Sequence, residues 1–245
     1  MDQRYTCQQL RHVMLCLIGV WLLSGCAAVV KQPSLITVST SVDVAAFPTD
    51  LRGAQLYQID TEQSQLRILV HRAGTMAHLG HNHVMSSSTL SGYVWLHPSL
   101  IQRSGFDLRL PVNDFIVDSP EARSAEGEEF PLNVTDAARA ATKTNMLKPE
   151  GLDGKHYPQV RLRSVTINGG RTMPEVTFDL TIKDKARRMT IPVQLSVAAQ
   201  QLRAKGEFVI KQSEFGMKPM SVMLGALQVQ DLITIKFDLV ALPLN

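Results

Sequence analysis

Apolar and polar residues alternate with a period of two along most of the chain beyond Leu56. In one such run, Phe106, Leu108 and Leu110 alternate with Asp107. Successive side chains of a strand point to opposite faces, so this period predicts strands with one buried face. Eight runs show the pattern: 66–70, 90–96, 106–110, 160–163, 176–182, 189–197, 202–210 and 233–239.

This many strands, punctuated by glycine, proline and polar residues, predicts a mainly β, antiparallel barrel or sandwich. A barrel leaves few free strand edges that other chains could pair with. Pro192 interrupts one run, which places that strand at an edge or a bulge because proline donates no backbone hydrogen bond.

The segment between Pro120 and Leu147 breaks the alternation, since it is rich in alanine and charged residues. Thr135 or Asp136 is suited to cap a helix that runs toward Met146. We expect one or two short helices that cross the barrel or cap one of its mouths.

The N-terminal segment has the layout of a secretory signal: Arg4 and Arg11, an apolar run, then small residues. Leu23-Ser24-Gly25-Cys26 resembles a bacterial lipobox, which predicts cleavage before Cys26 and lipid attachment to its thiol. The expected organisation is a signal peptide at 1–25, a tether at 26–54 and a barrel domain at 55–245. An uncleaved transmembrane anchor is the alternative, because the apolar character continues to Val30.

Lipidation of Cys26 predicts a protein anchored to the membrane on the periplasmic side of the envelope. Ala27, rather than an aspartate, follows the cysteine, and this favours the outer membrane. Cleavage before Cys26 removes the other two cysteines, Cys7 and Cys16, and leaves no thiol for a disulfide or a zinc-thiolate site. The net charge of +3 is too small to indicate nucleic-acid binding.

Several motifs, in this order and spacing, resemble the YceI-like family of polyisoprenoid-binding proteins between residues 57 and 242. They are Tyr57-Gln58-Ile59-Asp60, His156-Tyr157-Pro158, Asp179-Leu180-Thr181-Ile182 and Gln212-Ser213-Glu214-Phe215-Gly216. The resemblance implies a lipocalin-like barrel that holds an isoprenoid or another long-chain lipid. The segment from His78 to His83 lies outside the general family pattern.

The inward-facing residues of such a barrel are the candidate lipid contacts. The set that we expect to line the lumen is Val70, Phe106, Leu108, Phe178 and Phe208. The alternative is that these side chains form a packed core, because small barrels are often filled by side chains.

A histidine cluster is the sharpest local feature of the chain. His78, His81 and His83 lie within six positions, and neutral imidazole is a common ligand of transition metals and haem. The hypothesis is a metal or haem site. The alternatives are a polar loop bonded to backbone and water, or a site for the polar head of the lipid. The acidic residues nearby are interpreted as a solvated loop: Asp118, Glu121, Glu126, Glu128 and Glu129.

Together these features predict a binding protein rather than an enzyme. The chain carries no nucleophile elbow and no glycine-rich phosphate loop. The leading hypothesis is a lipid-binding envelope lipoprotein. A periplasmic metal- or haem-binding protein is the alternative, and an envelope protein without a ligand is a third possibility.

Overall fold

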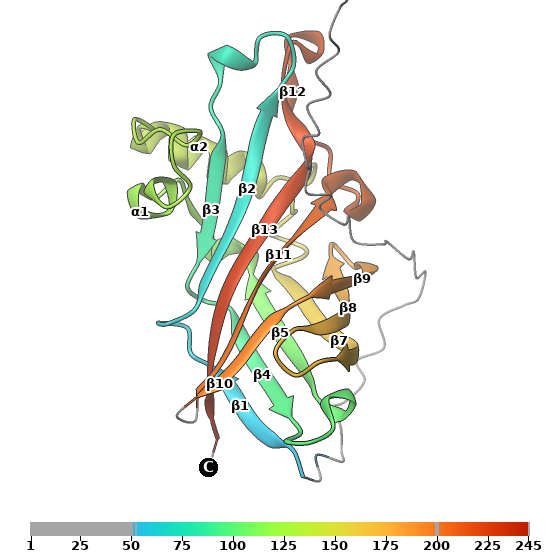
Figure 1. Ribbon diagram of the computed structural model, residues 1–245. Helices are drawn as coiled ribbons and strands as arrows, with labels where there is room; N and C mark the ends of the chain where they lie inside the picture. Colours follow the sequence, from blue (N-terminus) through green and yellow to red (C-terminus); the bar gives the residue numbers. More distant parts are fainter. Residues whose placement is uncertain (1–50, 52, 199–200, 245) are drawn as a thin grey trace, which may run out of the picture. The chain divides into compact units, whose positions relative to one another are not determined.

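The computed structural model describes residues 51, 53–198 and 201–244. The predicted signal peptide, Cys26 and most of the predicted tether lie outside the described residues. Thirteen strands and two α-helices form the described part (Figure 1). The strands are β1 Gln55–Ile59, β2 Gln65–Ala73, β3 His83–Ser87, β4 Ser91–Leu96, β5 Gly105–Pro111, β6 Ile116–Val117, β7 Gln159–Gly169, β8 Pro174–Ile182, β9 Lys185–Pro192, β10 Gln194–Ala198, β11 Gln201–Lys211, β12 Ser221–Val222 and β13 Leu227–Pro243. The helices are α1 Pro120–Ser124 and α2 Asp136–Met146, and 3₁₀ turns lie at Ala77–Leu79, Ile101–Arg103, Val112–Asp114, Gln212–Phe215 and Met223–Gly225.

The long strand β13 organises the sheet, and every ladder of the described strands is antiparallel. One edge of β13 pairs with β11. The other edge pairs with β2, where Ile233 lies opposite Val70, and then with β1, where Ala241 lies opposite Ile59. From β1 the order continues through β4, β5, β7, β8 and β9. The prediction of a mainly β, antiparallel fold is confirmed.

The wall has a seam between β9 and β11, since no ladder joins these two strands within the described residues. The chain leaves β9 at Pro192 and continues as β10, which pairs with β11 instead. Across the seam, Arg187 of β9 donates a hydrogen bond of 2.5 Å to the carbonyl oxygen of Glu214. The prediction that Pro192 marks an edge or a bulge is confirmed, and within the described residues no backbone ladder closes the barrel at this seam.

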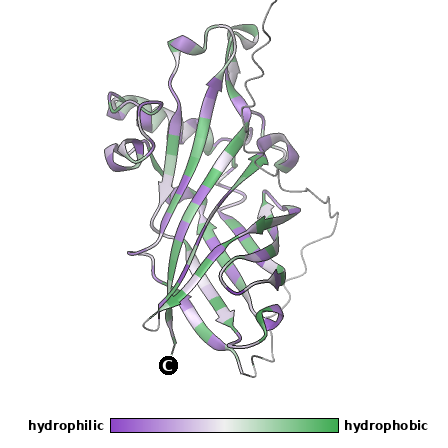
Figure 2. Cartoon of the chain, in the orientation of Figure 1, coloured by the Kyte–Doolittle hydropathy of each residue, from purple (hydrophilic) through white to green (hydrophobic). Residues whose placement is uncertain are grey.

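Hydrophobic and hydrophilic residues alternate along the strands (Figure 2), and the buried apolar side chains form two clusters. The inward faces form the main core, to which Ile68 and Val70 of β2 belong. The outward residue Leu69 of β2 packs instead with Val84 of β3, and residues 118–134 supply the remaining members, Ala122 and Phe130. β2 and β3 are therefore covered on their outer as well as their inner face.

Helix α2 confirms the predicted helix and its cap. The hydroxyl oxygen of Thr135 accepts a hydrogen bond of 3.2 Å from the backbone N–H of Ala138, and Asp136 lies in the first turn, where negative charge is favourable. Thr142, Asn145 and Met146 of α2 line the barrel cavity. Among the described residues, no helix is long and apolar enough to cross a bilayer.

Candidate functional site

The inward faces of the strands enclose a cavity of about 600 Å³. Sites for small molecules commonly measure about 300–1,000 Å³. The five residues predicted to line the lumen all lie on its wall: Val70, Phe106, Leu108, Phe178 and Phe208. All five also belong to the main apolar core or pack against it, so they are part of the packed interior and also border open space.

Aromatic rings follow one another around the inner wall, from β5 through β8 and β11 to β13. The ring centroids of Phe106 and Phe178 are 6.2 Å apart, those of Phe178 and Phe208 are 5.6 Å apart, and those of Phe208 and Phe237 are 6.3 Å apart. These spacings are typical of favourable edge-to-face and tilted pairs. The rings give the lumen a stiff, apolar surface.

The cavity opens at one end, between the turn after α2 and the segment that follows Met217. The lining residues that are also exposed to solvent are Asn145, Lys148, Glu150, Lys218, Met220 and Ser221. The backbone N–H of Lys218 donates a hydrogen bond of 2.7 Å to the carbonyl oxygen of Glu150 and joins the two sides of the opening. Most polar lining residues belong to this mouth, and the rest of the lumen is almost entirely apolar.

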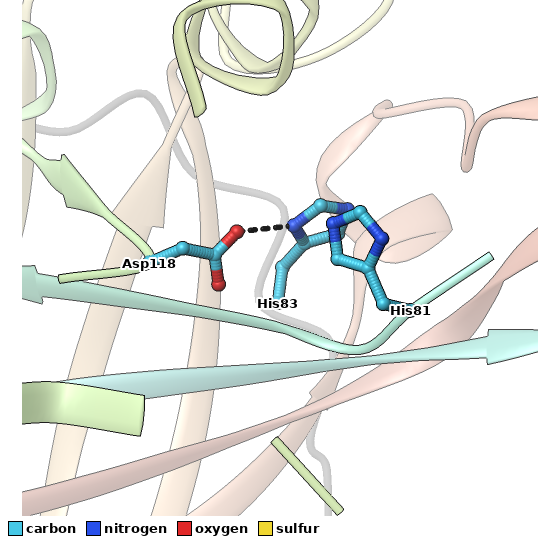
Figure 3. Close-up of side chains that lie close together, drawn as sticks. All are labelled: His81, His83 and Asp118. Atoms are coloured by element: carbon cyan, nitrogen blue, oxygen red, sulfur yellow. Dashed lines mark hydrogen bonds and ion pairs between the residues drawn. The ribbon is translucent and has the colours of Figure 1, made fainter. Parts of the chain in front are cut away.

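A buried ionic network lies beside the lumen, with Asp118 at its centre. One carboxylate oxygen of Asp118 accepts hydrogen bonds from the backbone N–H of Val84 at 2.9 Å and from Arg123 at 2.5 Å. The other accepts from Nδ1 of His83 at 2.6 Å (Figure 3). The side chains of Asp118 and Arg123 are both fully buried. Asp118 directly follows β6 and has a positive φ of 54°, which turns the chain from β6 toward α1.

Helix α1 places Arg123 over this carboxylate. Ser119 caps the helix by accepting a hydrogen bond from the backbone N–H of Ala122, and Pro120 occupies its first turn. Arg123 then donates to the carbonyl oxygens of Asn82 at 2.8 Å and Pro131 at 2.6 Å. The network thus ties β3, β6, α1 and the following loop together.

The interpretation of the acidic segment as a solvated loop is wrong for two of its members. Asp118 is buried against Arg123, and the side chain of Glu126 is only 3% exposed because it pairs with Arg67 at 2.7 Å and Lys236 at 2.6 Å. Packing of residues 118–134 over β2 and β3 removes these carboxylates from water. The other members, Glu121, Glu128 and Glu129, are exposed as expected.

The structure brings together two of the three predicted histidines. The rings of His81 and His83 have centroids 4.5 Å apart, and one ligand atom from each lies within 4.8 Å of the others in a group completed by Asp118. His83 lines the cavity, whereas Nε2 of His81 is buried without a hydrogen-bond partner. His78 is exposed in the 3₁₀ turn Ala77–Leu79 and lies outside this group.

The protonation states follow from burial and from these contacts. Burial alone would raise the pKa of Asp118, but hydrogen bonds from His83 and Val84 and the nearby charge of His83 lower it below its ordinary value. An ionised carboxylate only accepts, so Nδ1 of His83 carries the proton of this hydrogen bond. Burial, and then repulsion by His83, lowers the pKa of His81 and favours its neutral form.

We expect Asp118→Asn to lower the free energy of unfolding by about 3–5 kcal/mol, because it leaves the guanidinium of Arg123 buried without its counter-charge. Asparagine tolerates the positive φ, so backbone strain adds little. Urea unfolding measures the change. Asp136→Asn is the matched control, since the carboxylate that pairs with Arg139 is 96% exposed and its loss should change stability little. Equal effects of the two substitutions would contradict the assigned role of the network.

The same substitution should also change how stability depends on pH. Because folding lowers the pKa of Asp118, its stabilising contribution is complete above the unfolded value of about 3.9 and is lost as pH falls through the lowered pKa. The difference in unfolding free energy between wild type and Asp118→Asn should stay constant from neutral pH to about pH 4 and shrink below it. Urea titrations at a series of pH values test this, and a difference that grows on acidification would refute it.

Comparison with known proteins agrees with this geometry. The YceI-like domain profile matches residues 57–241. The crystal structure of Burkholderia cenocepacia BcnA is similar, with a TM-score of 0.56 and 21% identity over 74% of this chain and 98% of that chain. A Campylobacter jejuni YCEI protein gives a TM-score of 0.48 and 11% identity over 66% of this chain and 84% of that one. No functionally curated protein matches the chain. Since the profile covers most of its length, the chain belongs to the YceI-like family of polyisoprenoid-binding proteins.

Proposed function

We propose that this protein holds an isoprenoid-like or other long-chain lipid in the lumen of its barrel. It acts on the periplasmic side of the bacterial envelope, anchored through a lipidated Cys26. The observation that carries the proposal is the apolar cavity of about 600 Å³ with an opening at one end. Family membership supports the same class of ligand, and the lipobox-like segment at Cys26 supports the anchor.

The lumen is apolar along its length and polar at its mouth, and a lipid has the same division into an apolar tail and a polar head. A long apolar chain needs no hydrogen-bond partner along its length and gains about 0.8 kcal/mol for each CH₂ removed from water. A polar head does need partners, and the exposed polar lining residues, among them Asn145, Lys148 and Lys218, lie at the mouth. The lumen therefore suits a lipid whose tail is buried and whose head remains near the opening.

We expect a large residue inside the lumen to exclude the lipid. Ala204 of β11 faces the cavity, whereas Val209 of the same strand is not part of its lining. Ala204→Phe should abolish most of the lipid mass carried by residues 27–245 exported behind a cleavable signal, as measured by native mass spectrometry. Val209→Phe, with the same new side chain on the other face, should retain it. A wild-type chain that neither carries nor takes up lipid would overturn the proposal.

A second candidate function, transition-metal binding, is favoured by the unpartnered Nε2 of His81 beside His83. A carboxylate that accepts from the distal nitrogen of an imidazole, as Asp118 does from His83, is a common arrangement around metal-ligating histidines. We propose His81 and His83 as ligands of zinc, copper or nickel, with Asp118 orienting His83. The two rings are too close to lie on opposite faces of one haem.

Metal titrations followed by calorimetry test this second function. His81→Ala and His83→Ala should each abolish tight binding, and Asp118→Asn should weaken it by about 10–100-fold. His78→Ala is the matched control, because His78 lies in the same segment but outside the group, and it should leave binding unchanged. Metal uptake that survives the loss of both His81 and His83 would exclude this site.

A further inference from the structure

Two loops form an apolar tip at the end of the barrel that lies away from the C-terminus (Figures 1 and 2). The loops are residues 74–82 and 218–226, and the backbone N–H of Met76 donates a hydrogen bond of 2.8 Å to the carbonyl oxygen of Ala226 to join them. The exposed large side chains of the tip are Leu79, Met220, Val222, Met223 and Leu224. On soluble proteins, exposed apolar side chains usually occur singly, whereas clusters of them are typical of surfaces that bind an apolar partner.

The second loop exposes most of these side chains to water and has a strained backbone conformation. Strand β12 pairs with β13 as a hairpin, and Met223 and Leu224 lie in its turn with φ values of 52° and 55°. Bulky residues rarely adopt this left-handed conformation, which asparagine and glycine tolerate far better. Leu224 is also 108% exposed, so neither packing nor backbone preference accounts for a leucine there.

The tip is continuous with the mouth of the lumen. Met220 belongs to both, and its neighbours Lys218 and Ser221 line the cavity while remaining exposed. Any apolar phase that receives Met223 and Leu224 is therefore brought next to the opening. A lipid tail would then pass between that phase and the lumen with little of its length crossing water.

The charged residues around the tip favour contact with an anionic lipid surface. The chain has no Asp or Glu between Glu62 and Asp107, or between Glu214 and Asp231, so both loops are free of acidic residues. Arg72, which borders the first loop, and Lys218 in the second are both exposed. Acidic groups on neighbouring elements include Glu150 at the mouth, Glu129, whose carboxylate is 3.7 Å from His71, and Asp231, which accepts hydrogen bonds from Ser213. Basic residues beside an apolar insertion are typical of proteins that bind anionic lipid surfaces.

We propose that the apolar tip docks into an anionic phospholipid leaflet and sets the mouth of the barrel at the membrane surface. The role of this contact in ligand exchange rests on the proposed lipid-binding function, but the docking itself does not. We assign the partner of the tip as a bilayer rather than a second copy of the chain, because the tip is small, basic and adjacent to a lumen of a size suited to a lipid.

Tryptophan fluorescence in vesicles tests the docking directly. The full chain is reconstituted with vesicles of equal parts of phosphatidylglycerol and phosphatidylcholine, with bromine on the lipid tails as quencher. Leu224→Trp should add fluorescence that these lipids quench, relative to the parent chain. Val197→Trp is the matched control, since Val197 is an exposed apolar residue outside the tip, and its added fluorescence should not be quenched. Quenching should weaken in phosphatidylcholine alone.

A second variant separates docking from folding. Met223→Asn combined with Leu224→Asn suits the left-handed backbone, so the double variant should unfold at the same urea concentration as wild type or a higher one. It should nevertheless transfer a fluorescent polyprenyl lipid between vesicle and lumen at least tenfold more slowly. Unquenched Leu224→Trp would overturn the docking proposal, and unchanged transfer would overturn the role of docking in ligand exchange.

The two proposals fail in different ways. Lipid in the lumen without quenching at Leu224→Trp overturns the docking and keeps the lipid-binding function. Quenching without lipid in the lumen keeps the docking and overturns that function. A dimer that forms without vesicles and is lost in the double asparagine variant would assign the tip to a second copy of the chain, and would overturn docking to a bilayer.

Discussion

Strand β13 pairs along both of its edges, and the positions of the other strands follow from these ladders. Its register with β11 places Phe237 opposite Gly206, where the absent side chain leaves room for the aromatic ring. Its register with β2 places Ile233 opposite Val70, and its last residues pair with β1. A slip of one residue would turn every one of these side chains to the other face. The existence of a lumen, and which residues line it, therefore depends on this strand.

The sequence predicts the fold well where one face of a strand is buried and fails where both are. β3 escapes prediction because Val84 packs outward against Leu69 while Met85 packs inward, so polar and apolar residues do not alternate. β7 extends from the predicted 160–163 to Gly169 because a bulge between Ser164 and Thr166 shifts the phase of the pattern. α2 and the break at Pro192 were predictable because a cap and a proline act locally.

The candidate site divides in the same way. The five lumen residues were predictable from strand face together with the family resemblance, and all five line the cavity. Asp118 was not assigned to the histidine cluster, because its partners His83 and Val84 are 35 and 34 positions away in the chain. Only the pairing of β6 with β3 brings the carboxylate to them. The positively charged Arg123 among acidic residues was the one local signal that these charges would pair.

The buried network explains how an apolar barrel keeps one oriented polar group at its wall. A charged pair such as Asp118 and Arg123 gains little stability over an apolar pair of the same size, so its presence has to be explained by geometry. It clamps α1 over the outer faces of β2 and β3, and it fixes the ring of His83, which borders the lumen. The same carboxylate therefore holds the outer cover and sets the tautomer of the inner imidazole.

The lumen is buried and apolar at one end and is lined by exposed residues at the other. Trp95, Leu96 and Ile101 line the cavity as buried residues, whereas its exposed lining residues all belong to the mouth. The strained hairpin with Met223 and Leu224 begins at that same mouth. A turn selected for stability alone would carry asparagine or glycine at these two positions. Bulky apolar residues at these positions strain the left-handed backbone and also expose apolar surface to water. An apolar phase beside the opening would remove the cost of that exposure. A lumen whose exposed lining residues all lie beside such a turn has a direction for ligand exchange built into its fold.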